Sequence, residues 1–202
     1  MLPYLFVGVL VVSKVLGGQF TRLTRLKIRD GYWLLGALAV QLGAILFRPQ
    51  APTLGAILFI FSYLGLIAFC LRNRHICGMA LILAGICLNF VVIGLNGGSM
   101  PISAQTLQTI GRGQRLETPA VQVGVPATNN APAQLVKVSK DAVNETPTLA
   151  LLGDVIVLPF PGQFATALSF GDVLIFLGIS WLILKTMQIP AFSKLDWKAF
   201  AR

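Results

Sequence analysis

Five long apolar runs constrain this chain more than any other feature of its sequence. They cover residues 2–16, 32–47, 52–71, 76–95 and 169–187. About 20 apolar residues in a helix cross the hydrocarbon core of a bilayer, which is roughly 30 Å thick. Charged residues make up only 11% of the chain, against about 25% in soluble proteins. The sequence therefore predicts an all-α integral membrane protein with five transmembrane helices in a single membrane domain, residues 1–202.

The positions of the basic residues predict how these helices are oriented. With the start of the chain outside, most of the sixteen lysine and arginine residues fall in short cytoplasmic segments, as the positive-inside rule requires. Lys14 interrupts the region where a signal-peptide cleavage site would stand, so the first run is expected to be retained. We therefore expect a multi-pass protein of the bacterial cytoplasmic (inner) membrane, with its N-terminus outside and its C-terminus inside.

Basic residues beside the predicted spans indicate contact with anionic lipid headgroups. The candidate headgroup-binding residues are Arg22, Arg25, Lys27, Arg29, Lys194, Lys198 and Arg202. They alternate with apolar residues in segment 19–29 and in the tail 190–202, which predicts two short interfacial helices. Because positive charge gathers next to the spans, the net charge of +9 favours a lipid bilayer as partner and argues against nucleic acid.

The long polar region between the fourth and fifth runs predicts an extracytoplasmic loop over residues 97–168. Within it, residues 118–147 are rich in Ala, Pro, Thr and Asn without a helical period, which predicts a poorly ordered insertion. Residues 149–160 are almost entirely apolar but too few to span a bilayer. They predict a re-entrant or interfacial segment packed against the helices.

Two aspartates lie beside apolar sequence in a repeated pattern, Gly-Asp-Val, at Asp154 and Asp172. An aspartate at bilayer depth is costly and normally marks a site or a specific partner. A structural role is the alternative: Asp172 follows Ser169 by three residues, which is a capping-box pattern, and Asp154 follows a glycine in a turn. Asn89 and Asn96 share one helix face, which predicts either interhelical hydrogen bonds or a polar pocket with the aspartates.

The remaining candidate site residues lie at the same expected outer end. The candidate catalytic residues are Asp154 and Asp172, and the pocket or partner-binding residues are Asn89, Asn96, Gly97, Gly98, Met100, Pro101, Gly153, Pro159, Ser169 and Gly171. No cofactor and no metal site are expected. The three cysteines, Cys70, Cys77 and Cys87, form no CxxC pair, and His75 is the only histidine.

The run LNFVVIGLNGGSMPIS at residues 88–103 resembles a family of bacterial multi-pass membrane proteins, domain of unknown function 5317. Later parts of that pattern are also present, LGDVIVLP at 152–159 and FGDVLI at 170–175. The order, the spacing and the basic first loop agree over nearly the whole chain. The resemblance implies the five-span topology and implies no mechanism.

A second likeness is to the aspartyl lipoprotein signal peptidases, small polytopic enzymes with two catalytic aspartates near the outer face. Their Asn-Thr-Gly-Ala-Ala-Phe motif is similar to residues 96–101, and their Phe-Asn-Xaa-Ala-Asp motif is similar to residues 168–172. Here Ser169 replaces the asparagine of the second motif, and Leu151 and Val155 stand around Asp154 where that family has Asn and Arg. This resemblance implies peptide hydrolysis.

These observations leave three hypotheses for the function. The favoured one is a non-enzymatic membrane subunit or scaffold that binds a membrane-protein or lipid partner through its outer face, because no specific catalytic signature is present. The alternative is a membrane-embedded aspartyl hydrolase, in which Asp154 and Asp172 lie close enough to share a proton and activate water. The third is a small transporter, for which no inverted repeat is visible.

Overall fold

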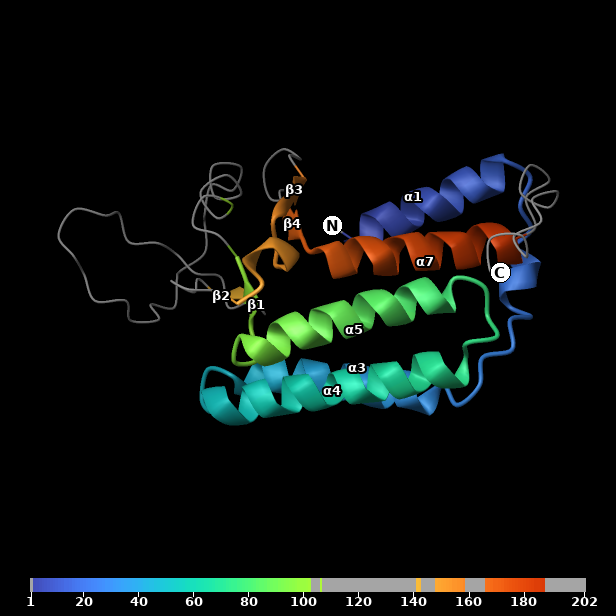
Figure 1. Cartoon of the computed structure of the whole chain (residues 1–202). Coiled ribbons are helices and arrows are strands. Elements are labelled where there is room, and N and C mark those ends of the chain that lie inside the picture. The colour runs from blue at the N-terminus through green and yellow to red at the C-terminus, as the bar shows by residue number, and fades with distance from the viewer. Residues whose placement is uncertain (1, 103–105, 107–140, 143–147, 159–165, 188–202) are drawn as a thin grey trace, which may run out of the picture.

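The computed structural model describes residues 2–102, 106, 141–142, 148–158 and 166–187. Its long helices are α1 (Leu2–Val15), α3 (Tyr32–Phe47), α4 (Pro52–Arg72), α5 (Met79–Leu95) and α7 (Phe170–Thr186) (Figure 1). Each occupies one of the five apolar runs, and α2 (Phe20–Leu23) adds a single turn between α1 and α3. The described part of the chain is therefore mostly helical, as the sequence predicts.

The long helices lie side by side along one common axis (Figure 1). α3 packs on α4, α4 on α5, α5 on α7, and α7 on α1. Short connections make α3, α4 and α5 alternate in direction, and α7 runs antiparallel to α5 and parallel to α1. The described residues of the bundle thus form a loop end, with residues 48–51, 96–102, 148–158 and 166–169, and a basic end, with residues 16–31, 73–78 and 187.

Aromatic and aliphatic side chains of α4 and α5 form the centre of the buried core. Phe59 and Tyr63 on α4 meet edge to face, with ring centroids 5.7 Å apart, and Tyr63 also lies 6.1 Å from the Phe90 ring of α5. Ile86 and Val92 of α5 are buried in the same cluster. This continuous packing holds the two helices in register along much of their length.

Glycines allow α5 and α7 to approach each other closely. A Cβ atom on Gly85 would collide with the carbonyl oxygen of Gly171, and a Cβ on Gly78 would collide with the carbonyl oxygen of Gly178. On each side of this contact the two glycines are seven residues apart, so the close approach repeats after two helical turns. Small residues at a helix interface let the backbones pack directly against each other.

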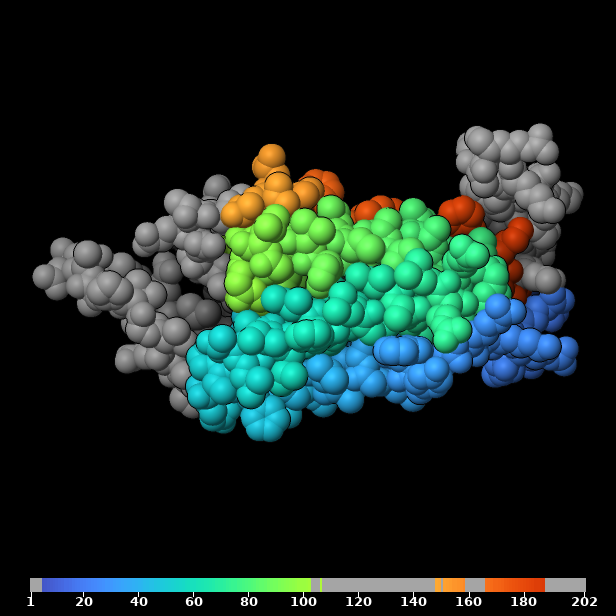
Figure 2. Space-filling model, turned by 60° about the horizontal axis from the view of Figure 1, so that its bottom comes forward, coloured from blue at the N-terminus to red at the C-terminus, as the bar shows by residue number. Residues whose placement is uncertain are grey.

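The exterior of the bundle is strongly apolar. By length and composition, α4 is the one helix among the described residues long and apolar enough to cross a membrane, and shorter apolar helices cover Leu5–Val15, Tyr32–Phe47 and Met79–Leu95. Leu35 and Leu46 of α3 are 69% and 62% exposed, and Val15 of α1 is 80% exposed. Figure 2 shows α4 and α5 packed side by side on one face of the molecule.

Short strands form at the loop end. β1 (Met100–Pro101) pairs in parallel with β2 (Asp141–Ala142), and β3 (Ile156–Leu158) pairs antiparallel with β4 (Thr166–Leu168). β4 leads directly into α7. β4 therefore holds β3 close to the first turn of the last helix.

The apolar segment 149–160, predicted as a re-entrant or interfacial segment, is not a helix in its described part, and its position relative to a membrane stays a prediction. Its described part, 149–158, forms a single 3-10 turn, η1 (Ala150–Leu152), followed by strand β3. The β-branched residues Ile156 and Val157 favour a strand, and β4 supplies its hydrogen-bonding partner. The predicted insertion 118–147 lies outside the described residues apart from β2, as do Pro159 and the tail 190–202.

Segment 19–29, predicted as a short interfacial helix, contains the four-residue helix α2, and its interfacial position stays a prediction. Buried Asn73, at the end of α4, binds the last residue of this segment. Its side chain accepts from the backbone N–H of Arg29 and donates to the Arg29 carbonyl oxygen, both at 2.8 Å. These bonds satisfy the backbone groups of Arg29, and they tie the connection to the bundle.

Candidate functional site

The first turn of α7 carries a capping box. The Ser169 hydroxyl accepts the backbone N–H of Asp172 at 3.0 Å, and Asp172 Oδ2 accepts the backbone N–H of Ser169 at 3.3 Å. The side chain at each position thus satisfies a backbone donor that the helix leaves open. The negative carboxylate also lies at the positive end of the helix dipole. Capping is therefore one role of Asp172 in this structure.

Asn89 of α5 completes a closed set of hydrogen bonds around this cap. Its side-chain nitrogen donates to Asp172 Oδ1 at 2.9 Å, and its side-chain oxygen accepts the Ser169 hydroxyl at 2.9 Å. All three side chains are buried, with exposed fractions of 2% for Asn89, 0% for Ser169 and 8% for Asp172. The interhelical hydrogen bond that the sequence offered as one reading of Asn89 is present.

Gly171 is required by this arrangement. A Cβ atom at that position would collide with the side-chain oxygen of Asn89. A glycine here therefore lets the α5 amide reach the α7 cap. The structure brings together four of the residues that the sequence selected, Asn89, Ser169, Gly171 and Asp172. Both carboxylate oxygens of Asp172 accept hydrogen bonds from this cluster.

Asp154 lies in a different local setting at the loop end. Its backbone N–H donates to the Pro101 carbonyl oxygen at 3.0 Å, and it forms a parallel bridge with Ile102. The residue is 1% exposed, and Gly153 and Met100 beside it are also buried. This bridge fastens the segment after η1 to the chain that leaves α5. The catalytic pairing of Asp154 with Asp172 stays a prediction.

Asn96 and its neighbours close the end of α5. The Asn96 side chain donates to the Val92 carbonyl at 2.7 Å and exchanges two hydrogen bonds with the backbone of Thr148. Gly97 and Gly98 have positive φ angles of 65° and 83°, a conformation that glycine adopts readily. Arg48 donates to the Gly98 carbonyl oxygen at 3.0 Å. These contacts hold Thr148 and the Gly97–Gly98 turn at the end of α5.

The predicted headgroup-binding residues separate into two groups. Arg22, Arg25 and Lys27 line an open groove at the basic end, whereas Arg29 lies outside it. Sequence reasoning missed the other lining residues. They are Gln19, Thr21, Leu26, Lys185 and Thr186. No local pattern places the end of α7 beside segment 19–27, so no signal in the sequence could have found this pairing. Lys194, Lys198 and Arg202 lie outside the described residues.

The described residues hold no cluster of three or more His, Cys, Asp or Glu side chains that could bind a metal ion. Burial, acting against the lowering influence of Lys185 and a backbone hydrogen bond, raises the pKa of the Cys77 thiol between α4 and α5 above its ordinary value. A raised thiol pKa reduces the fraction of reactive thiolate. A thiol that is activated as a nucleophile has its pKa lowered instead.

Comparison with known proteins gives one family. Residues 25–184 match the family described as Family of unknown function (DUF5317). This range contains the capping cluster and the bridge at Asp154, and three of the eight groove residues, Arg25, Leu26 and Lys27. No curated protein and no solved structure matches the chain. Since the matched range covers well over half of the 202 residues, the chain belongs to this family of unknown function, as its sequence motifs predict.

Proposed function

We propose that this chain is a five-span membrane protein that acts as a non-enzymatic subunit or scaffold and binds a protein or lipid partner through its outer face. The observation that carries this proposal is the hydrogen-bonded cluster of Asn89, Ser169 and Asp172. It engages the acidic side chain of α7 in helix capping and helix packing. The carboxylate thereby supports the loop end, which is the proposed binding face.

The exposed apolar side chains support a membrane environment. On α3, Leu35, Leu42 and Leu46 are each more than half exposed. Soluble monomers rarely expose extended apolar surface, whereas a bilayer solvates it. The helices of 14 to 21 residues lie side by side, and tilt and snorkelling side chains accommodate the shorter ones. These features support five spans for the five helices.

The distribution of charge supports an orientation with the loop end outside. Described basic residues at the basic end include those of segment 22–29, Arg72, Arg74 and Lys185. The loop end has Arg48 on its short connection, and Arg48 is hydrogen-bonded to Gly98. The positive-inside rule then places the basic end in the cytoplasm of a bacterial cell. The start of α1 lies outside under this proposal, and the end of α7 lies inside.

The loop end offers apolar side chains for a partner. Leu151 is 80% exposed, and Leu149 and Phe170 are 43% and 46% exposed. They lie on η1, just before it, and at the first residue of α7. Their backbone is fixed by the Asn96–Thr148 hydrogen bonds and by the Asp154 bridge. A rigid apolar surface binds a partner with less loss of conformational entropy than a flexible one.

Cysteine labelling tests the proposed topology. In a chain with Cys70, Cys77 and Cys87 changed to Ala, a single cysteine is introduced by Gln50→Cys at the loop end or by His75→Cys at the basic end. Both native residues are exposed. A membrane-impermeant maleimide is expected to label the Gln50→Cys chain in intact spheroplasts and the His75→Cys chain only after lysis. The reverse pattern would overturn the orientation, and labelling of both would overturn the spanning topology.

Photo-crosslinking tests the scaffold function. A photoreactive amino acid at position 151 is expected to give one discrete adduct with a membrane protein or a lipid, and the same probe at position 75 is expected to give none. The adduct should persist in the Asp154→Asn chain, because the bridge at Asp154 is formed by its backbone. Absence of an adduct at position 151 would contradict the proposal. Accumulation of uncleaved membrane proteins in both the Asp154→Asn and the Asp172→Asn chains would also contradict it and would favour the aspartyl hydrolase.

A further inference from the structure

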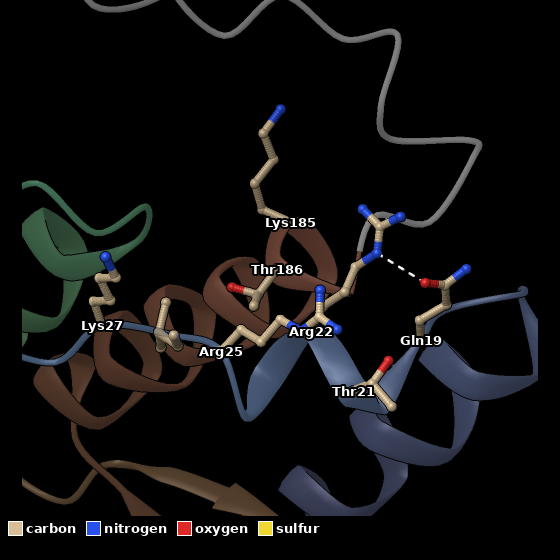
Figure 3. Close-up of a pocket in the computed structure, with 8 residues that line it drawn as sticks. Gln19, Thr21, Arg22, Arg25, Lys27, Lys185 and Thr186 are labelled. Atoms are coloured by element: carbon tan, nitrogen blue, oxygen red, sulfur yellow. Dashed lines mark hydrogen bonds between the residues drawn. The ribbon is translucent and has the colours of Figure 1, made fainter.

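The groove at the basic end is formed by two segments that are far apart in the sequence. It has a volume of about 630 Å³, and its lining residues are Gln19, Thr21, Arg22, Arg25, Leu26, Lys27, Lys185 and Thr186. Figure 3 shows Gln19, Thr21, Arg22 and Arg25, from the connection after α1, beside Lys185 and Thr186 at the end of α7. We propose that this groove binds the phosphate of an anionic phospholipid headgroup. The inference rests on the proposed membrane topology, which places the groove at the cytoplasmic surface of the bilayer.

The groove is held in shape by the backbone. The Gln19 N–H donates to the Met187 carbonyl oxygen at 3.1 Å, and the Gly18 N–H donates to the Ser13 carbonyl oxygen at 2.9 Å. Gly18 is buried, and a Cβ at that position would meet Ser13 and Met187. The connection after α1 is therefore pressed against the end of α7. The relative positions of the two basic segments follow from these contacts.

Four cationic side chains line this groove, and their positive charge is not balanced by an acidic side chain among the described residues. Arg22, Arg25, Lys27 and Lys185 have no ion-pair partner among the described residues, whereas Arg72 at the same end pairs with Asp30 at 3.4 Å. Among the described residues, no carboxylate lines the groove. Mutual repulsion of like charges opposes this gathering, and a bound anion relieves it. The favourable interaction of a cation with a helix C-terminus accounts for Lys185 alone.

The polar groups of the groove match the acceptors of a phosphate. Arg22 Nε donates to the Gln19 side-chain oxygen at 2.9 Å, which orients the guanidinium plane and leaves its four terminal N–H groups for another acceptor. Arginine binds phosphate oxygens through two parallel hydrogen bonds. The hydroxyl groups of Thr21 and Thr186 are further donors. Leu26 gives the lining an apolar side chain, which suits the start of a lipid acyl chain better than a free ion.

Lipid retention tests the site with a matched pair of double variants. The groove variant carries Arg22→Gln and Arg25→Gln. The control carries Lys14→Gln and Arg74→Gln, which removes the same charge from exposed residues near the same end but outside the groove. The full chain is reconstituted into phosphatidylcholine nanodiscs containing a trace of spin-labelled phosphatidylglycerol. The measured quantity is the fraction of motionally restricted label, titrated against unlabelled phosphatidylglycerol.

The groove variant is expected to bind phosphatidylglycerol about 10-fold or more weakly, because each lost contact is a charge-assisted hydrogen bond. The control is expected to change by less than about 3-fold, since exposed charges act only through the general surface potential. An equal loss in both variants would overturn the groove as a site. Displacement of the lipid by excess inorganic phosphate would overturn the lipid as its occupant and assign the groove to a free phosphate.

These results are distinguishable from a failure of the proposed topology. Circular dichroism and gel filtration of both double variants report whether the chain is folded. Labelling of the Gln50→Cys and His75→Cys chains reports which end faces the cytoplasm. A groove variant that is folded, correctly oriented and unchanged in lipid binding would overturn the inference while leaving the proposed function in place.

Discussion

Asn89 of α5 donates a hydrogen bond of 2.9 Å to Oδ1 of Asp172 in α7, and it joins residues 83 positions apart in the sequence. The same carboxylate caps α7 through Ser169. One acidic side chain thus links the start of the last helix to its neighbour. Further along the contact, the close approaches at Gly85 and Gly78 maintain the same helix separation. The α5–α7 pair is consequently the best place to test the fold.

Replacement of Asn89 with Leu removes the donor to Asp172 and the acceptor for Ser169. Because both partners are buried, the unfolding free energy is expected to fall by about 1–3 kcal/mol. Ala84→Leu is the matched control, since it introduces the same residue at an exposed position of α5, where a change within about 0.5 kcal/mol is expected. Thermal unfolding in detergent, followed by circular dichroism, compares the two chains. Equal midpoints would contradict a stabilising role for Asn89.

Gly171→Ala places a methyl group against the Asn89 side-chain oxygen. Overpacking at a closely packed contact is expected to destabilise the chain by about 1–3 kcal/mol. A Cβ on Gly94 of α5 meets nothing within 4 Å, so Gly94→Ala is expected to be neutral or to stabilise by up to about 1 kcal/mol. Differential scanning calorimetry of both variants tests the contrast. If the two substitutions behaved alike, close packing at Gly171 would be wrong.

Asn73→Ala removes three hydrogen bonds, two to the Arg29 backbone and one to the Phe69 carbonyl oxygen. The connection between α1 and α3 then loses its attachment to α4, so local opening of residues 19–29 is expected to increase. Limited trypsin digestion of the purified chain should cut this basic segment several times faster than in the unaltered protein. Exposed His75→Ala is the control, and an unchanged digestion rate in Asn73→Ala would exclude the anchoring role.

Reaction of Cys77 with a maleimide is expected to be slow near pH 7 and to accelerate at higher pH than for an ordinary thiol. Burial raises its thiol pKa, the thiolate is the reactive form, and a raised pKa moves its appearance to higher pH. The comparison uses two single-cysteine chains, one keeping Cys77 and one with His75→Cys at an exposed position. Stopped-flow or gel-shift rates across pH 7–10 measure the difference. Coincident profiles would refute the effect of burial.

Much of the helical architecture could be predicted from local sequence. The run 32–47 is a helix with the same bounds in the structure, and Pro52 lies at the start of α4, where proline is favoured. The capping box at Ser169 is likewise a local pattern, and the structure contains it. Segment 149–160 was harder, because a short apolar run without periodicity is compatible with several structures. Its pairing with Thr166–Leu168 selected a strand.

The candidate site depended on contacts that no local pattern encodes. Residues 22, 25 and 27 are recognisable as a basic segment, but the presence of Lys185 and Thr186 in the same groove depends on how α7 packs. In the same way, the spacing of Asn89 indicated a shared helix face without naming Ser169 and Asp172 as its partners.

Local sequence is sufficient for the positions of the helices, the location of basic residues and the cap of α7, because these depend on hydrophobic runs and on residues three or four positions apart. The Asn89–Asp172 bond, the glycine contacts of α5 with α7 and the assembly of the groove arose only in the tertiary structure. These contacts join segments separated by many residues, and their geometry depends on which helix faces meet. Glycine at positions 85 and 171 lets the backbones of α5 and α7 approach closely, and this close approach is what allows these two helix faces to meet.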